Sequence, residues 1–226
     1  MCPFCYIGKR RFEAAMAEFG NSQNIEIEWK SFLLNPELQT DPSKNIHQFL
    51  AEHKGISLEE AQGMNDQVAH MAAESGLKFD FDKAIPANSF NAHRFLHYTK
   101  IYGKQNEAEE ALFKAYFTEG KNIDDANTLT EIAISLGLDT EELAKDMSSD
   151  AFFQDVVMDV QEAREIGVRG VPFFVFNRKY AVSGAQTVDV FSQTLEKSFG
   201  EWQEAAQPVK LDVTEGDSCG VDGENC

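Results

Sequence analysis

The sequence predicts an α/β fold in which a small α/β domain is divided by a large insertion made only of helices. Two short motifs near opposite ends of the chain indicate the small domain. They are a Cys-Pro-Phe-Cys dithiol at residues 2–5 and a proline-led apolar run at residues 172–176. Between them, residues 44–165 show helical periodicity and almost no strand signal. More than half of the chain therefore belongs to the helical block.

The dithiol lies on the first turn of a helix predicted over residues 3–19. Pro3 suits the first helical position because its fixed φ is already helical. Cys2 then takes the N-cap, where free backbone N–H groups and the positive end of the helix dipole stabilise a thiolate and lower its pKa. Cys5 follows one turn later on the same side. We expect Cys2 to be the nucleophile and Cys5 the resolving thiol, with Pro3 and Phe4 contacting the substrate.

The middle of the chain begins with a strand and continues as helices. Residues 25–32 alternate apolar and polar side chains, which predicts a strand, and two Asx-Pro steps then break the chain into loop. Ser57 with Glu60 forms a capping box that starts one of the helices. Helices are predicted at residues 45–53, 57–75, 87–102, 106–119, 127–136, 140–147 and 150–165.

The last third of the chain returns to strand and turn signals. The run 173–176 is rich in β-forming residues, Asn177 and Arg178 suit a turn, and residues 179–183 suit the second arm of a hairpin. A final helix is predicted from Thr187 onward, with apolar residues on one face.

This order of elements, opened by a dithiol, predicts a thioredoxin-like fold with three parts. Residues 1–36 and 166–207 form a discontinuous thioredoxin-like domain, and residues 37–165 form the inserted helical domain. Residues 208–226 are polar and rich in Gly and Asp, so they are expected to form a flexible C-terminal tail.

The first strand of such a fold is missing from this sequence. A thioredoxin-like fold carries its dithiol on the loop after a β-strand, yet only Met1 precedes Cys2. A vacancy at the centre of the sheet leaves backbone groups unpaired, at about 1–3 kcal/mol for each buried one. We expect about 6–15 further residues upstream in the natural chain, forming a strand of ordinary length. The alternative is that other residues fill the gap.

Composition narrows the possible partners and compartments. The net charge of −18 argues against nucleic acid or an anionic membrane surface. No apolar run approaches the roughly 20 residues of a membrane span, and no signal peptide is visible. The four cysteines form two close pairs, Cys2 with Cys5 and Cys219 with Cys226, which is unlike a disulfide scaffold.

The second motif runs from Gly167 to Phe174 and centres on Pro172. In thioredoxin-like folds a cis-proline at the start of a strand packs against the dithiol, and the preceding residue, here Val171, offers its backbone to an extended substrate. The alternative is an ordinary proline at the first position of a strand. Read alone, the dithiol also resembles half of a zinc site. The proline motif favours redox chemistry, so no metal is expected.

Four spaced motifs give the chain a family resemblance. They are residues 2–10, 32–36 and 88–94, and the stretch from Gly170 to Gln186. Together they resemble the FrnE-like branch of the DsbA family, which is related to 2-hydroxychromene-2-carboxylate isomerases and kappa-class glutathione transferases. The resemblance covers essentially the whole chain.

The resemblance implies a thioredoxin fold with an inserted helical domain and thiol–disulfide oxidoreductase activity. It implies a cytoplasmic enzyme that needs no cofactor and exchanges disulfides with thiol- or disulfide-containing proteins, or with glutathione as a co-substrate. The isomerase branch usually has serine at the position of Cys2, so cysteine there favours disulfide exchange. The missing first strand also removes any buried acid that relatives place on it.

Further residues are weaker candidates, each with a structural alternative. Asn88 and His93 lie on the stretch of the helical domain expected to approach the dithiol and to contact substrate, although the sequence favours a half-buried packing role for His93. Cys219 and Cys226 are either an accessory dithiol that exchanges with the first pair, a disulfide that staples the tail, or two free thiols.

Two other functions remain open from the sequence. One is a glutathione-dependent isomerase or transferase, and the other is a non-catalytic, chaperone-like binding module. Monomer and homodimer are both compatible with the sequence.

Overall fold

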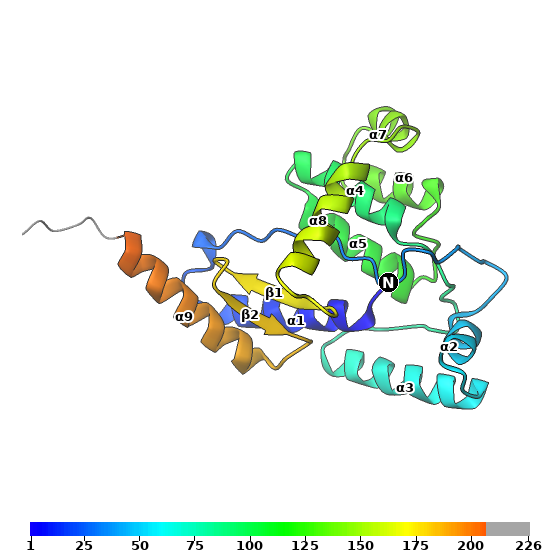
Figure 1. The fold of residues 1–226 in the computed structure, drawn as a ribbon, viewed down its shortest axis with the longest axis horizontal. Coiled ribbons are helices and arrows are strands. Elements are labelled where there is room, and N and C mark those ends of the chain that lie inside the picture. The colour runs from blue at the N-terminus through cyan, green and yellow to red at the C-terminus, as the bar shows by residue number, and fades with distance from the viewer. Residues whose placement is uncertain (207–226) are drawn as a thin grey trace, which may run out of the picture.

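Helix α1 lies near the centre of the molecule, between the hairpin end and the helical block (Figure 1). The computed structural model describes residues 1–206. In chain order the elements are α1 (Pro3–Glu18), the 3₁₀ turn η1 (Ser22–Asn24), α2 (Ile46–Lys54), α3 (Leu58–Glu74), α4 (Phe90–Ile101), α5 (Gln105–Phe117), α6 (Ala126–Ser135), α7 (Thr140–Met147), α8 (Phe153–Glu165), β1 (Phe173–Phe176), β2 (Tyr180–Ser183) and α9 (Val188–Ala206).

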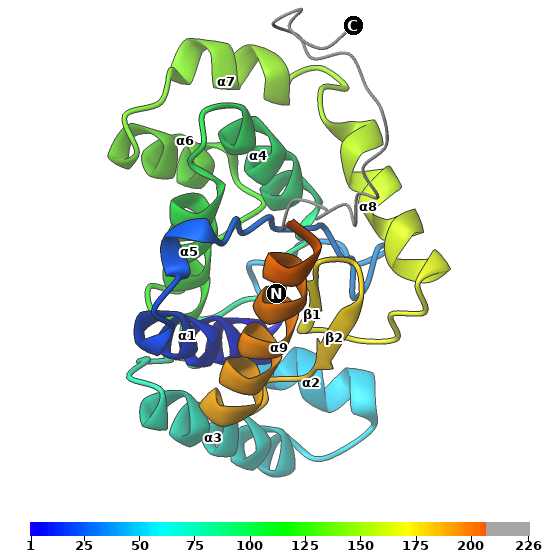
Figure 2. The same ribbon diagram turned by 90° about the vertical axis from the view of Figure 1, so that its left-hand side faces the viewer.

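The two strands form an antiparallel hairpin that packs with α1 and α9. Phe173 pairs with Ser183 at one end and Phe176 with Tyr180 at the other. The turn residues Asn177 and Arg178 both have positive φ, at 48° and 55°, as a tight hairpin requires. The predicted hairpin is therefore confirmed. Figure 2 shows the pair lying beside α9.

Two hydrophobic cores meet on α1. Its first turns contribute Tyr6 and Ile7 to a large core shared with the helical block. Its later turns contribute Phe12 and Ala15 to a smaller core with the hairpin and α9, where the Phe12 ring packs edge-on to Phe191. Figure 2 shows α1 between α3 on one side and α4 and α5 on the other. The N-terminal end of α1 therefore lies where the two cores join.

The helical block matches the sequence prediction closely. All seven predicted helices occur, as α2 to α8, with ends displaced by no more than three residues. The Ser57–Glu60 capping box is formed at the start of α3. Gly120 lies between α5 and α6 with φ of 68°, and a Cβ there would stand 2.8 Å from the Lys83 carbonyl oxygen. Only glycine fits this close turn.

The predicted strand at residues 25–32 is wrong. Within the described part of the chain, this segment is extended but pairs with no strand. Side chains from helices satisfy its backbone instead. The Gln105 amide bonds both the N–H and the carbonyl of Trp29 at 3.0 Å, and the Ser31 N–H donates to Asp159 at 2.8 Å. The alternation is also a poor guide to burial, since Ile27 is 41% exposed.

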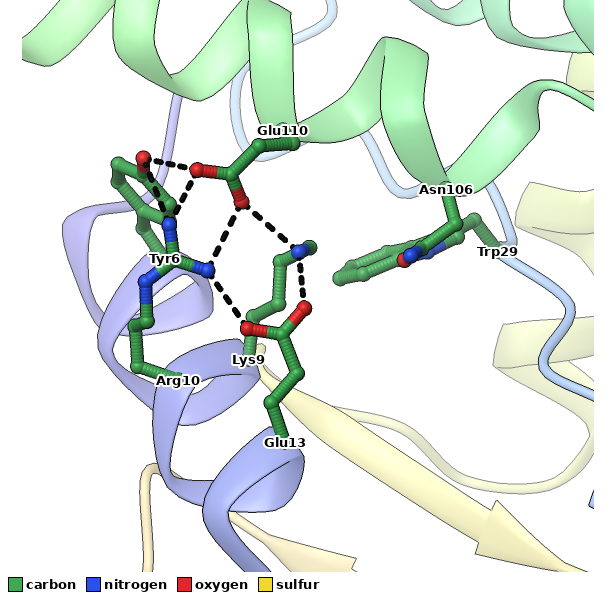
Figure 3. A network of polar contacts seen from close by, with 7 residues as sticks. All are labelled: Tyr6, Lys9, Arg10, Glu13, Trp29, Asn106 and Glu110. Atoms are coloured by element: carbon green, nitrogen blue, oxygen red, sulfur yellow. Dashed lines mark hydrogen bonds and ion pairs between the residues drawn. The ribbon is translucent and has the colours of Figure 1, made fainter. Parts of the chain in front are cut away.

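A polar network fastens α1 to α5 (Figure 3). Glu110 on α5 accepts hydrogen bonds from the Tyr6 hydroxyl at 2.5 Å and from the ammonium group of Lys9 at 2.8 Å, and it pairs with Arg10. Glu13 pairs with both Lys9 and Arg10 from one turn along α1. Lys9 is buried, so these carboxylates neutralise a charge that would otherwise be costly.

Candidate active site

The dithiol occupies the start of α1 as the sequence predicts. Cys2 is the N-cap, with extended φ and ψ of −97° and 118°, and Pro3 is the first helical residue. The Cys5 N–H donates to the Cys2 carbonyl at 3.2 Å, which closes the first turn. Both sulfurs are half-buried and are not joined in a disulfide. Phe4 points outward and is 37% exposed.

The two thiols have opposite acidities. A hydrogen bond from the Cys5 thiol is the largest influence on Cys2, and with the Cys5 and Phe4 backbone N–H groups it lowers the pKa of Cys2 to about 7 despite burial. The same hydrogen bond, together with burial, raises the pKa of Cys5 far above its usual range. Cys2 is therefore the thiolate near neutral pH, and Cys5 keeps its proton.

The proline loop lies directly against this pair. The peptide bond between Val171 and Pro172 is cis. The thiol of Cys2 lies 3.5 Å from the Val171 carbonyl oxygen, to which it donates when protonated. Pro172 is buried against α1 at Gly8, where an added Cβ would stand 3.1 Å from Pro172 Cγ. The glycine thus allows the loop to approach the dithiol closely.

A cavity of about 360 Å³ opens beside the dithiol, between the proline loop, the 29–38 segment and helices α4 and α5. Cys2, Cys5 and Val171 line one side. Most of the rest is aromatic or aliphatic, including Phe32 and Phe113. A largely apolar cavity with a few polar groups next to a reactive sulfur is the usual form of a small-molecule or side-chain binding site.

His93 on α4, which the sequence places near the dithiol, lines this cavity. Burial lowers the pKa of His93 to about 4, so the ring is neutral at pH 7. The Phe32 backbone opposes this shift, and the buried Nδ1 of the ring has no hydrogen-bond partner among the described residues. His93 is thus both a packing residue and a possible ligand contact.

Glu109 on α5 is a site residue that the sequence reasoning missed. It lines the cavity, is 7% exposed, and its Oε2 has no hydrogen-bond partner within residues 1–206. Burial raises its pKa to about 8, against the opposing charge of Lys9. Helical spacing could have found it, because Glu109 precedes the buried Leu112, Phe113 and Tyr116 by three, four and seven positions.

Other predicted residues lie elsewhere. The Asn88 amide donates to the Leu38 carbonyl at 2.7 Å and accepts from the Phe90 N–H at 2.8 Å, so its side chain holds a loop to the start of α4 and does not line the cavity. Cys219 and Cys226 lie outside the described residues. In residues 1–206, no three His, Cys, Asp or Glu side chains form a group that would hold a metal.

A buried Ser-His-Asp cluster lies away from the dithiol and does not have the geometry of a catalytic triad. The Ser31 hydroxyl and the Asp159 carboxylate both contact the same His97 nitrogen, Nε2, at 3.2 and 3.1 Å. In a triad the serine and the acid use opposite nitrogens of the ring. The cluster instead fastens the 25–32 segment to α4 and α8.

Comparison with known proteins identifies the family to which the fold belongs. The model of the DSBA-like thioredoxin domain matches residues 1–196. A crystal structure of a probable DsbA oxidoreductase from Streptomyces coelicolor is 35% identical, with a TM-score of 0.83 over 98% of this chain and 93% of that one. The uncharacterised protein YwbO of Bacillus subtilis is 27% identical over 198 residues, which is 86% of this chain and 91% of YwbO.

More distant structures share the fold alone. A 2-hydroxychromene-2-carboxylate isomerase has 16% identity and a TM-score of 0.63, over 91% of this chain and 95% of its own. The cytosolic disulfide reductase DsbM from Pseudomonas aeruginosa, solved with GSH, has 15% identity and a TM-score of 0.62, over 88% of this chain and 95% of its own. The predicted fold class is therefore confirmed.

Proposed function

We propose that this chain, which belongs to the DSBA-like thioredoxin domain family, is a thiol–disulfide oxidoreductase that reacts through Cys2 and Cys5. The observation that carries the proposal is the split acidity of the two thiols beside the Val171 carbonyl. A thiolate with a pKa near the ambient pH is the most effective attacking thiol.

The exchange proceeds in two steps. The Cys2 thiolate attacks one sulfur of a substrate disulfide, forms a mixed disulfide and releases the other substrate sulfur as a thiolate. Cys5 then loses its proton and attacks the Cys2 sulfur, which releases the second substrate thiol. The substrate gains two electrons, and the enzyme ends with a Cys2–Cys5 disulfide. In the opposite direction the same steps oxidise a substrate dithiol.

The partners follow from this chemistry and from the family. We infer a protein or small thiol as the exchange partner, with glutathione as the candidate small thiol, and a cytoplasmic site of action. The membership in the DSBA-like family and the resemblance of the motifs to its FrnE-like branch support this assignment. None of the helices in residues 1–206 is long and apolar enough to cross a membrane.

Reduction of insulin disulfides, followed by turbidity with a small thiol as reductant, tests the proposal. Cys2→Ser is expected to abolish catalysis, because no thiolate remains to attack. Cys5→Ser is expected to accumulate a mixed disulfide at Cys2, detectable by mass spectrometry. Circular dichroism of each variant confirms that it is folded. Undiminished insulin reduction by folded Cys2→Ser would refute the proposal.

The cavity favours a second candidate, a glutathione-dependent isomerase. A volume of about 360 Å³ next to Cys2 accommodates a small aromatic molecule, and most of the lining is apolar. Such an enzyme has no need of the resolving thiol. Saturable glutathione binding, with turnover of a small aromatic substrate that survives Cys5→Ser, would favour the isomerase over the oxidoreductase.

A further inference from the structure

Within residues 1–206, two buried side-chain polar atoms lack a hydrogen-bond partner, His93 Nδ1 and Glu109 Oε2. Both residues line the cavity beside the dithiol, one from α4 and the other from α5. A buried polar atom without a partner costs about 1–3 kcal/mol, so folded proteins rarely leave one without a reason. Two such atoms in one cavity indicate a site for a polar ligand group.

The chemistry of the two atoms defines that group. The His93 ring is neutral and so carries one proton; with that proton on Nε2, Nδ1 presents a lone pair. Glu109 has a pKa of about 8, so its carboxyl is largely protonated at neutral pH, and a bound cation favours its ionised form, which is a strong acceptor. With Glu109 ionised, both atoms accept hydrogen bonds, and the complementary ligand group is a donor. A donor that also carries positive charge forms the stronger, charge-assisted bond with Glu109.

The side-chain charges around the cavity favour a cation over an anion, and burial lowers the pKa of the Met1 amino group, which also lines the cavity. Lys30 is the lysine that lines the cavity, and its ammonium lies within 3.4 Å of Glu28, Asp159 and Glu162. Its charge is therefore already balanced by carboxylates. The chain as a whole carries a net charge of −18, which attracts cationic partners over a longer range.

From these contacts we propose that the cavity receives a cationic, hydrogen-bond-donating group of the substrate, a lysine- or arginine-like side chain next to the reacting sulfur, bound by Glu109 and His93. This inference rests on the proposed oxidoreductase function and names its substrate class. The apolar walls accommodate the aliphatic stem of such a side chain, while the two acceptors bind its charged end. Specificity thus comes from the helical block, and the exchange chemistry comes from α1.

The test uses three short disulfide peptides that differ at the residue beside the reacting cysteine, which is Lys, norleucine or Glu. Their reduction by the full-length, reduced protein gives a second-order rate constant for each. Wild-type protein is expected to prefer the Lys peptide over the Glu peptide by about tenfold or more, from one charge-assisted hydrogen bond. Norleucine, which keeps the stem and lacks the charge, should fall between them.

Two variants separate the cavity from the overall charge of the protein. At a pH above 8, where Glu109 is ionised, Glu109→Gln removes the buried carboxylate and should reduce the preference for Lys to less than about threefold. Glu107→Gln removes the same charge from the exposed face of the same helix and should leave the preference unchanged. Glu109→Asp retains the charge and should retain most of the preference, which provides a rescue if the amide perturbs folding.

Salt gives an independent measurement on the unaltered protein. Long-range attraction by the net charge is screened at 1 M salt, where the Debye length is about 3 Å, whereas a contact inside the cavity is screened much less. The Lys preference should therefore persist at high salt. Equal preferences in wild type and Glu109→Gln, or a preference that disappears in salt, would overturn the inference. Failure to reduce any of the three peptides would instead count against the proposed function itself.

Discussion

Adding one methyl group at Gly8 tests whether the proline loop and α1 fit together as closely as the structure indicates. The Cβ of Gly8→Ala would lie 3.1 Å from Pro172 Cγ and 3.2 Å from Phe174 Cζ. The Pro172 ring is rigid and directly precedes β1, and the Phe174 ring is held in place by packing against Phe12 and Phe191. Overpacking of this kind costs about 1–3 kcal/mol.

The same substitution also gains helix propensity, so a matched control is needed. Gly63 lies in the interior of α3 with nothing within 4 Å of an added Cβ. Gly63→Ala should therefore raise the free energy of unfolding by about 0.5–1 kcal/mol, the gain of alanine over glycine in a helix. Since Gly8→Ala has the same gain, the difference between the two variants isolates the overpacking cost of about 1–3 kcal/mol.

Urea unfolding of the reduced proteins, followed by circular dichroism, measures both free energies. We expect Gly8→Ala to unfold at lower urea than Gly63→Ala, with unchanged slopes. A displaced loop should also weaken the contact between Cys2 and the Val171 carbonyl, and the pH profile of Cys2 alkylation reports on that change. Equal stabilisation of both variants would show that the loop is loosely packed and would refute the reasoning.

Substitutions at three further positions, Cys5, Asp159 and Glu110, test the charges that the structure assigns. The pH profile of Cys2 alkylation should show an apparent pKa of about 7 in the wild type. This pKa should rise in Cys5→Ala and rise less in Cys5→Ser, because serine retains a hydrogen-bond donor. An identical pH profile in all three proteins would contradict the assigned hydrogen bond. Asp159→Asn should lower the free energy of unfolding in urea by about 2–4 kcal/mol at neutral pH. Burial opposes ionisation of Asp159, but bonds from His97, Ser31 and Lys30 lower its pKa to about 2, below the unfolded value of 3.8. The contribution of Asp159 to the free energy of unfolding is therefore present above pH 3.8 and is lost as the pH falls through 2. The stabilities of wild type and Asp159→Asn should accordingly converge in acid. Glu110→Gln should lose about 1–3 kcal/mol in urea unfolding, whereas Glu107→Gln should change stability by less than about 0.5 kcal/mol.

The sequence predicts the site best where local motifs determine geometry. Proline after a cysteine fixes the start of a helix, so the placement of Cys2 and Cys5 needs no tertiary information. The cause of the low Cys2 pKa is different. Backbone N–H groups at the helix start do contribute, but the largest influence is the Cys5 thiol, which depends on how the two side chains meet in the folded protein.

The errors arise where a pattern needs a partner that lies elsewhere in the chain. Residues 25–32 alternate like a strand, but a strand is defined by its ladder, and here helix side chains bond the backbone instead. Asn88 lies on the stretch expected to reach the dithiol, yet its amide donates to the carbonyl of Leu38 in a different loop. Glu109 was missed because a run of acidic residues reads as a solvated helix face until its spacing is compared with the apolar positions.

The contrast between Lys9 and Glu109 is the strongest reason to regard the cavity as built for a ligand. Both are buried charged residues where α1 faces α5. Lys9 is paired with two carboxylates, Glu13 and Glu110, so the fold neutralises its charge. Glu109, the neighbour of Glu110 on α5, keeps an oxygen without a partner among the described residues. Burial raises the pKa of Glu109 to about 8, so at neutral pH the cavity holds a largely protonated carboxyl with an unpaired oxygen, and a ligand that bonds this oxygen offsets the cost of its desolvation.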